Sequence, residues 1–340
     1  MRGAGRPGGR GSGGAGPRPE ILVAPDSFKG TFTATEAAGA IARGLRGGGL
    51  DAVELPVADG GEGTMDVLTR GLDAEGRTVE VTGPLGEPTE AAFALLADGA
   101  TAIVETAQAS GLGLVAEGER DAYAASTRGT GELIAAAAQA GAATVLITVG
   151  GSATTDGGAG ALEALHEAGV SPRLEVLCDV RTVWEDAPRV FGPQKGADSD
   201  TVRRLEQRLE ELRAASPRDP RGVPMTGAAG GLSGGLWAHR GAKLLAGAAH
   251  VLSAIGFDRQ MREAAFVVSG EGGLDRQSLQ GKVVGELATR CRQAGVACHA
   301  VVGRNQLGPF EARILDLESV TEATTLEELE AAGRALAGAI

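Results

Sequence analysis

The 340-residue sequence has only three cysteines, few aromatic residues and no long apolar run. The cysteines are too few and too scattered for a disulfide framework or a zinc site, which suits a reducing compartment. No apolar stretch reaches the roughly 20 residues that a membrane-spanning helix needs. Residues 1–19 lack the apolar core of a secretory signal, and their Gly/Arg/Pro composition predicts a disordered tail. We therefore expect a cytoplasmic protein that does not enter a membrane.

Positive charge is also scarce. The chain has 44 acidic and 32 basic residues, a net charge of −12, which argues against nucleic acid and anionic membranes as partners. Only four residues are lysines, and three of them, Lys29, Lys195 and Lys282, adjoin a glycine. A compact ammonium group in a glycine loop suits a phosphate contact, although 55 glycines also allow such neighbours by chance.

From residue 20 onward, short apolar segments alternate with amphipathic ones. This alternation predicts an α/β fold with a largely parallel sheet, and the length suggests two domains. We expect strands at residues 21–24, 52–58, 78–82, 90–96, 101–105, 143–149, 174–178, 266–268 and 298–302. We expect helices at residues 33–45, 62–69, 131–140, 157–168, 201–215, 243–254, 284–293 and 325–337.

Glycine-rich polar loops follow several of these strands. Ligands of parallel α/β sheets bind at the carboxyl ends of strands, so we expect the chemistry in these loops. The loop at residues 150–158, GGSATTDGG, offers backbone N–H groups and hydroxyls to a phosphate. It lacks the G-K-[S/T] ending of a Walker A loop. The alternative is a turn whose glycines only permit close packing.

Acidic residues recur in the same loops. Asp26, Asp59, Asp156 and Asp179 each lie near the end of an expected strand. Phosphoryl transfer needs a base for the acceptor hydroxyl, carboxylates for Mg²⁺ and cations for the phosphates. For any single aspartate, a helix cap or a turn is the commoner explanation, and only the recurrence favours chemistry.

Three further charged residues have two readings each. Glu271 and Asp275 lie in a glycine-rich loop, where they could hold Mg²⁺ or belong to a solvated turn. Arg128 precedes an expected helix and could bind a carboxylate or a phosphate.

Several long segments resemble those of one family. They include APDSFKGTFTATEAA, LPVADGGEGT, VGGSATTDGGAGALEAL, FGPQKGA and SGEGGLDRQSLQGK, which run in family order from about residue 20 to about residue 303. The chain resembles the bacterial type I glycerate kinases. The resemblance implies phosphorylation of D-glycerate to 2-phosphoglycerate with ATP and Mg²⁺. Its partners would be a small hydroxy acid and ATP, and a homodimer is one expected assembly.

The resemblance also implies a domain plan. A flavodoxin-like α/β domain with a mostly parallel sheet would comprise residues 20–85 and 256–340. A second, mixed α/β domain would comprise residues 86–255 and be inserted into the first. The active site would lie in the cleft between the two domains.

The residues and the resemblance together give a hypothesis for the site. We expect catalytic roles for Lys29, Asp156, Asp179 and Lys195; acceptor binding by Asp26, Ser27, Asp59, Glu62 and Arg128; nucleotide binding by Gly150, Gly151, Ser152, Thr154 and Lys282; and metal binding by Glu271 and Asp275.

The chain departs from the family pattern at three places. A family segment is missing after Gly169, residues 181–188 replace the family's NPLxGPxGA, and Gly273 stands where the family motif GEGRxD has arginine. These changes keep two alternatives open: a kinase for another small hydroxy acid in specialised metabolism, and a non-catalytic relative that binds a nucleotide or an anion.

Overall fold

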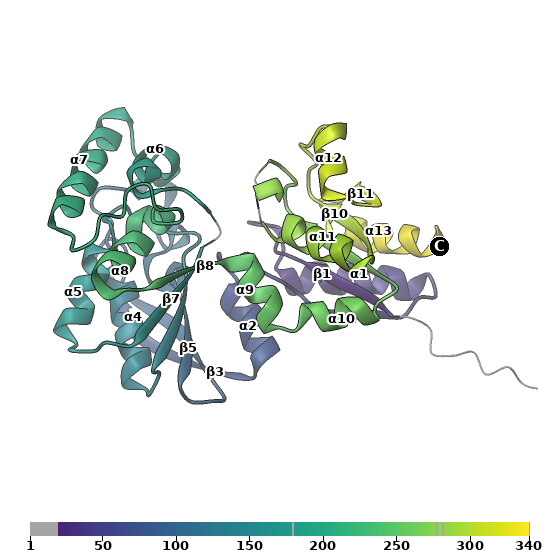
Figure 1. Cartoon of the computed structure of the whole chain (residues 1–340), viewed down its shortest axis with the longest axis horizontal. Coiled ribbons are helices and arrows are strands. Elements are labelled where there is room, and N and C mark those ends of the chain that lie inside the picture. The colour runs from purple at the N-terminus through teal and green to yellow at the C-terminus, as the bar shows by residue number, and fades with distance from the viewer. Residues whose placement is uncertain (1–19, 179, 277, 281, 340) are drawn as a thin grey trace, which may run out of the picture.

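The computed structural model describes residues 20–178, 180–276, 278–280 and 282–339, so the expected disordered tail at residues 1–19 lies outside it. Two lobes are visible, each built on one β-sheet (Figure 1). The α/β fold expected from the sequence is confirmed.

The first sheet has five parallel strands in the order β11-β10-β9-β1-β2 and is made from both ends of the described chain. The strands are β1 (Ile21–Pro25), β2 (Ala52–Glu54), β9 (Phe266–Glu271), β10 (Ala297–Val302) and β11 (Ser319–Glu322). The helices of this lobe are α1 (Ala34–Gly47), α10 (Phe257–Glu263), α11 (Val283–Ala294), α12 (Pro309–Leu315) and α13 (Leu326–Gly338).

Local sequence explains where this lobe's main helix begins. Thr33 and Glu36 form a capping box, in which each side chain accepts a hydrogen bond from the other residue's backbone N–H. Apolar residues of α1 and α13 then pack together on one face of the sheet, while α10 and α11 contribute to the core on the other face.

The second sheet has six strands in the order β3-β4-β5-β6-β7-β8. The strands are β3 (Ala74–Thr82), β4 (Pro88–Leu96), β5 (Thr101–Glu105), β6 (Thr144–Thr148), β7 (Arg173–Cys178) and β8 (Lys243–Ala246). β3, β4 and β5 pair antiparallel, whereas β5 to β8 pair parallel. The helices are α2 (Thr64–Leu72), α3 (Thr106–Ser110), α4 (Arg128–Gln139), α5 (Ala159–Glu167), α6 (Ala187–Phe191), α7 (Ser199–Ala215), α8 (Leu232–Arg240) and α9 (Gly247–Ala254).

Two expectations need correction. Residues 243–254 are not one helix, because Lys243–Ala246 pair with β7 as strand β8 before α9 begins. The first domain does not extend to residue 85, because Ala74–Thr82 pair along their whole length with β4 in the second sheet. Backbone pairing of a hairpin therefore overrides the boundary that the sequence suggested.

The two lobes share a hydrophobic core. Helices α2 and α9 lie between them (Figure 1), and their apolar side chains join one buried cluster with Leu22 of β1 and with Ile103, Leu146 and Leu177 of the second sheet. The loops at the junction are therefore held between two packed layers.

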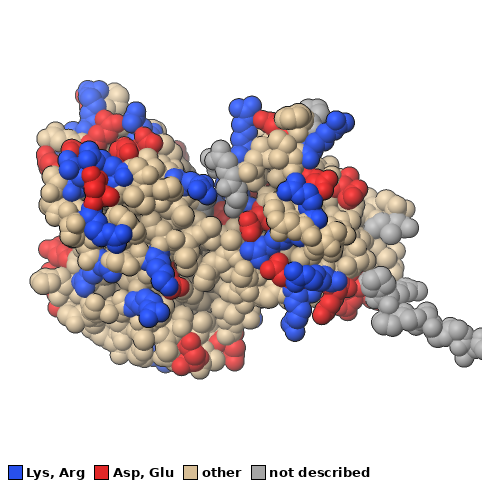
Figure 2. All heavy atoms as spheres, viewed as in Figure 1, with Lys and Arg blue, Asp and Glu red and all other residues tan. Residues whose placement is uncertain are grey.

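Among the described residues, no helix is both long enough and apolar enough to cross a membrane. Acidic and basic side chains are interspersed over the face seen in Figure 2, which also shows a notch between the two lobes.

Candidate active site

The loop after β2 joins the first lobe to the edge of the second sheet. Glu105, at the end of β5, is buried and accepts hydrogen bonds from the backbone N–H groups of Gly63 (3.0 Å) and Met65 (3.1 Å). Val149, just after β6, donates its N–H to the carbonyl of Gly60 (3.2 Å). The loop that carries Asp59 and Glu62 is thereby fixed against the carboxyl ends of second-sheet strands.

Buried carboxylates gather where the first sheet ends. The parallel register sets Pro25 opposite Gly270, so Asp26 and Glu271 leave the sheet on neighbouring strands. Asp59 is buried and its Oδ2 lies 3.1 Å from Lys29 Nζ. Burial, followed by the charge of Asp59, raises the pKa of Asp26 well above its usual value, although Lys29 opposes this shift.

Glu271 belongs to the same group of acids. Burial raises its pKa to about 7, while a 2.6 Å hydrogen bond from Ser278 Oγ and the charge of Lys282 act in the opposite direction. Asp275 lies further along this loop, where its backbone N–H donates to Ser278 Oγ (3.3 Å). Ser278 therefore connects the two acids that the sequence suggested as metal ligands.

Three adjoining hollows meet at Lys29. The carboxylate hollow, about 330 Å³, is lined by Asp26, Asp59, Glu271, Lys282 and Arg304 among others. The cationic hollow, about 370 Å³, is lined by Glu62, Arg120, Gly150, Gly151, Ser152 and Lys195 among others. The side hollow, about 330 Å³, is lined by Asp26, Ser27, Glu36, Glu62 and Asp66 among others. Lys29 lines all three, so residues from both lobes converge around it.

Lys195 is the buried cation of the cationic hollow. Its Nζ donates to Ser152 Oγ (3.0 Å) and to the carbonyl oxygen of Thr154 (2.5 Å). Burial lowers the pKa of Lys195 to about 7, against the opposing charge of Asp156. A lysine with a proton so loosely held gains from an anion that binds beside it.

The glycines of the 150–158 loop serve packing as well as access. A Cβ atom at Gly150 would lie 2.4 Å from the Cα of Gly61, so the loop needs glycine here to meet the Asp59 loop. Gly151 has a positive φ of 68° and lines the cationic hollow. Thr154 is fully buried and lines none of the three hollows, so it contributes its carbonyl to Lys195 instead.

Asp156 has the geometry of a structural anchor. Its buried carboxylate accepts four hydrogen bonds, from the N–H and hydroxyl of Thr127 and from the N–H groups of Gly158 and Gly160. It ties the start of α5 to the residue before α4, and it lines none of the three hollows. This arrangement matches the helix-capping alternative and favours it over a catalytic role.

Arg128 lies apart from the hollows. It forms ion pairs with Glu132, Glu163 and Glu167 across the outer surfaces of α4 and α5, at 3.0, 3.5 and 2.5 Å. Three carboxylates already surround this guanidinium, so the geometry argues against its expected role in acceptor binding. Asp179 lies outside the described residues, and its catalytic role stays a prediction.

Sequence reasoning missed Glu105 and Arg120. Glu105 ends an apolar strand, and a single acid there gives no sign that it holds a loop from the other lobe. Arg120 lies in a charged surface-like stretch and reaches the cationic hollow only through the tertiary fold.

The segment that replaces the family sequence is anchored by Trp184. Its ring is buried, its Nε1 donates to the carbonyl of Leu209 (3.1 Å), and its backbone N–H donates to Thr226 Oγ1 (2.9 Å). Cβ atoms at Gly157 and Gly231 would lie 2.7 and 3.0 Å from this ring. Trp184 therefore packs directly against the end of the 150–158 loop.

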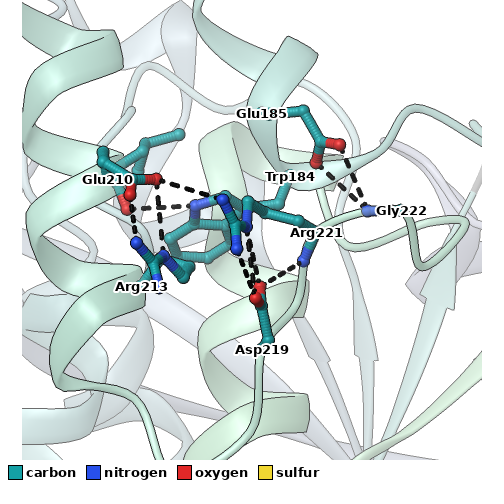
Figure 3. Close-up of polar contacts among 8 residues, drawn as sticks. Trp184, Glu185, Glu210, Arg213, Asp219, Arg221 and Gly222 are labelled. Atoms are coloured by element: carbon teal, nitrogen blue, oxygen red, sulfur yellow. Dashed lines mark hydrogen bonds and ion pairs between the residues drawn. The ribbon is translucent and has the colours of Figure 1, made fainter.

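Exposed polar contacts surround Trp184 (Figure 3). Glu185 accepts from the N–H of Gly222 (3.2 Å), and Arg221 pairs with Asp219 (2.7 Å) and Glu210 (3.9 Å). Solvent screens exposed ion pairs strongly, so the buried tryptophan is the main anchor of the replaced segment.

Comparison with known proteins agrees with this architecture. The model of the glycerate kinase family matches residues 21–173 and 166–336, two stretches that overlap at residues 166–173. The chain belongs to the glycerate kinase family. It is therefore a kinase, as the sequence motifs predicted.

Individual relatives cover most of the chain. Glycerate 2-kinase of Escherichia coli K12 is 39% identical over 303 residues, 78% of this chain and 80% of that protein. Glycerate kinase of Bacillus subtilis 168 is 40% identical over 329 residues, 84% of this chain and 85% of that protein. A crystal structure from Salmonella typhimurium LT2 assigned as glycerate kinase 2 has a TM-score of 0.78 and 32% identity, covering 95% of this chain and 98% of that one.

Proposed function

We propose that the protein is an ATP-dependent kinase that phosphorylates D-glycerate to 2-phosphoglycerate. The observation that carries the proposal is the convergence of buried acids, lysines and a glycine loop from both lobes around Lys29. Phosphoryl transfer relies on positioning and charge stabilisation more than on covalent chemistry, and this set of groups supplies both.

In this proposal the nucleotide phosphates lie in the cationic hollow. Backbone N–H groups of Gly150 and Gly151 and the hydroxyl of Ser152 face the phosphates, and Lys195 neutralises them. Lys29, at the meeting point of the hollows, contacts the phosphoryl group during its transfer. Lys282 adds positive charge from the carboxylate hollow.

Asp26 is our candidate for the base. It is buried, its raised pKa favours proton uptake, and it lines two of the hollows that meet at Lys29. The hydroxyl proton of the acid passes to the Asp26 carboxylate as the hydroxyl oxygen bonds to the terminal phosphorus, and ADP leaves with the electrons of the broken P–O bond. Ser27, Asp59 and Glu62 complete the acceptor side.

The carboxylates fit a magnesium ion. Among the described residues no ready-made cluster of three metal ligands is present, but Mg²⁺ is commonly held by one or two carboxylates together with phosphate oxygens and water. Glu271 would be one ligand and Asp59 or Asp275 another. Burial raises the pKa of both Asp26 and Glu271, and a divalent cation bound beside them would favour their charged forms. When bound, the ion neutralises phosphate charge.

A second candidate is a kinase for another small hydroxy acid. It is favoured by the replaced segment, because Trp184 packs against the loop that leads into the cationic hollow. The three cysteines are buried, which suits the cytoplasm, and a homodimer stays a prediction.

The test is turnover with D-glycerate, ATP and Mg²⁺, followed by ADP release, with the phosphate position read by ³¹P and ¹H NMR. We expect D-glycerate to be the best acceptor and 2-phosphoglycerate the product. A better acceptor in a panel of hydroxy acids would support the second candidate. ATP binding without ADP release from any acid would contradict both and indicate a non-catalytic relative.

A further inference from the structure

Arg120 lacks the carboxylate partners that some half-buried arginines of the protein have. Arg290, for example, pairs with both Asp258 and Glu286 at 2.9 Å. Among the described residues no carboxylate lies within ion-pairing distance of Arg120, and its buried Nε has no hydrogen-bond partner there. Within the described part of the chain, its guanidinium makes one long hydrogen bond, from Nη1 to the carbonyl oxygen of Gln194 (3.5 Å). A guanidinium with its Nε buried and unpartnered in this way favours an anionic ligand that can accept a hydrogen bond from it.

The fold holds Arg120 beside Lys195. Gly196 has a φ of 89°, and a Cβ atom there would lie 2.7 Å from the carbonyl oxygen of Arg120. The backbones of the two segments are therefore in direct contact. Arg120, Gln194 and Lys195 all line the cationic hollow.

The segment after Arg120 is firmly anchored to α7. Ala122 packs in a buried cluster with Ala197 and Leu205. The ring of Tyr123 lies between the guanidinium groups of Arg204 and Arg208, 3.9 and 4.1 Å from its centroid. Arg120 is thus presented by a packed segment, so little ordering is needed when a ligand binds.

We propose that Arg120 and Lys195 together bind one oxyanion of a substrate in the cationic hollow. The planar fork of arginine can donate two parallel hydrogen bonds to an oxyanion, while the lysine adds a point charge. The identity of the ligand rests on the proposed function. The terminal phosphates of the nucleotide are the favoured source of the oxyanion, because Gly150 to Ser152 line the same hollow. The carboxylate of the hydroxy acid has the same chemistry and is the other source.

The experiment measures binding by calorimetry, with MgATP alone and with D-glycerate alone, so no turnover is needed. It compares the wild type with Arg120→Ala and Arg120→Lys. Arg262→Ala is the control, because Arg262 is exposed on α10 and lines none of the hollows. We expect Arg120→Ala to weaken one of the two ligands about 10- to 100-fold, and Arg120→Lys to restore part of the loss.

The two sources give different results. Weaker MgATP binding with unchanged D-glycerate binding assigns the phosphates, and the reverse assigns the carboxylate. Unchanged binding of both ligands overturns the proposal. The proposal is also overturned if Arg120→Ala and Arg120→Lys weaken the binding of MgATP and of D-glycerate to the same extent and lower the melting temperature. Arg120 would then only support packing. A wild type that binds both ligands but releases no ADP contradicts the proposed function and leaves this inference standing.

Discussion

The carboxylate hollow and the cationic hollow are built alike but bury opposite charges. Each lies at the carboxyl ends of parallel strands and is lined by glycine loops. The first buries Asp26, Asp59 and Glu271, while the cations around it are more exposed. The second buries Lys195 and partly buries Arg120.

Burial pushes both groups toward their neutral forms. The pKa values of Asp26 and Glu271 are raised and that of Lys195 is lowered, in each case chiefly by loss of solvation. The comparison teaches that each hollow suits a ligand of opposite charge. The carboxylate hollow suits a metal ion beside the acceptor hydroxyl, and the cationic hollow suits an oxyanion. Four predictions test this contrast.

The largest effect on activity is expected at Asp26, the proposed base. Asp156, the structural anchor, serves as the comparison. Asp26→Asn removes the proposed base and should lower kcat about 10²- to 10⁴-fold. Its melting temperature should stay the same or rise, because a buried carboxylate becomes neutral. Asp156→Asn places donors opposite donors and should destabilise the protein by about 1–3 kcal/mol. Steady-state kinetics and thermal unfolding of both variants check this. A stable but inactive Asp156→Asn with an active but destabilised Asp26→Asn would exchange the two roles.

Next comes the lysine shared by the two hollows. Lys29→Ala should reduce kcat about 10²- to 10³-fold, because positive charge is lost where the phosphoryl group moves. Lys243→Ala is the matched control, since Lys243 is exposed on β8 and pairs only with Glu175 among the described residues. Steady-state kinetics of both variants give the answer. Similar activity in the two would remove Lys29 from the mechanism.

The buried carboxylate of Glu271 should also make the free energy of unfolding depend on pH. The folded-state pKa of Glu271, about 7, lies above its usual value of 4.5. The folded protein therefore holds this proton more tightly, and the resulting stability is fully present below pH 4.5 and lost as the pH rises through 7. Glu271→Gln should be more stable than the wild type at pH 8, by on the order of 1–3 kcal/mol, with the difference shrinking toward pH 4.5. Thermal unfolding across this range measures it, and a constant difference would contradict the assignment.

The smallest effect concerns the arginine that the family motif has at position 273. Arg304 follows β10 and lines the carboxylate hollow beside Gly273, and its N–H donates to the carbonyl of Gly272 (3.1 Å). We expect Arg304 to supply the missing guanidinium, so that Arg304→Ala raises the KM for one substrate about 10-fold.

A second variant checks whether Arg304 takes the place of the arginine that the family motif has at position 273. A Cβ atom at Gly273 would meet no atom within 4 Å, so a side chain can begin at this position without a backbone clash. Adding Gly273→Arg to Arg304→Ala should return the raised KM most of the way to the wild-type value. No recovery in the double variant, with Gly273→Arg alone fully active, would show that the two positions are not equivalent.

Regular elements were largely predictable from the sequence, because they depend on local patterns. The apolar run at residues 101–105 is strand β5 at the expected residues, and the Thr33–Glu36 pair starts α1 as its spacing predicts. Pattern alone failed at residues 243–254, where an apolar stretch with helical character begins as an edge strand. Only pairing with β7 decides that choice.

For the site, the sequence by itself determined that glycine, lysine and acidic residues stand at strand ends that local patterns reveal, and these are the loops to which we assign the chemistry. Only the tertiary structure decided what each charged residue faces. It satisfied Asp156 with four donors, surrounded Arg128 with surface acids, and left Arg120 beside Lys195. The physical reason is that a charge acts through its partners and its burial, and both come from segments far apart in the chain.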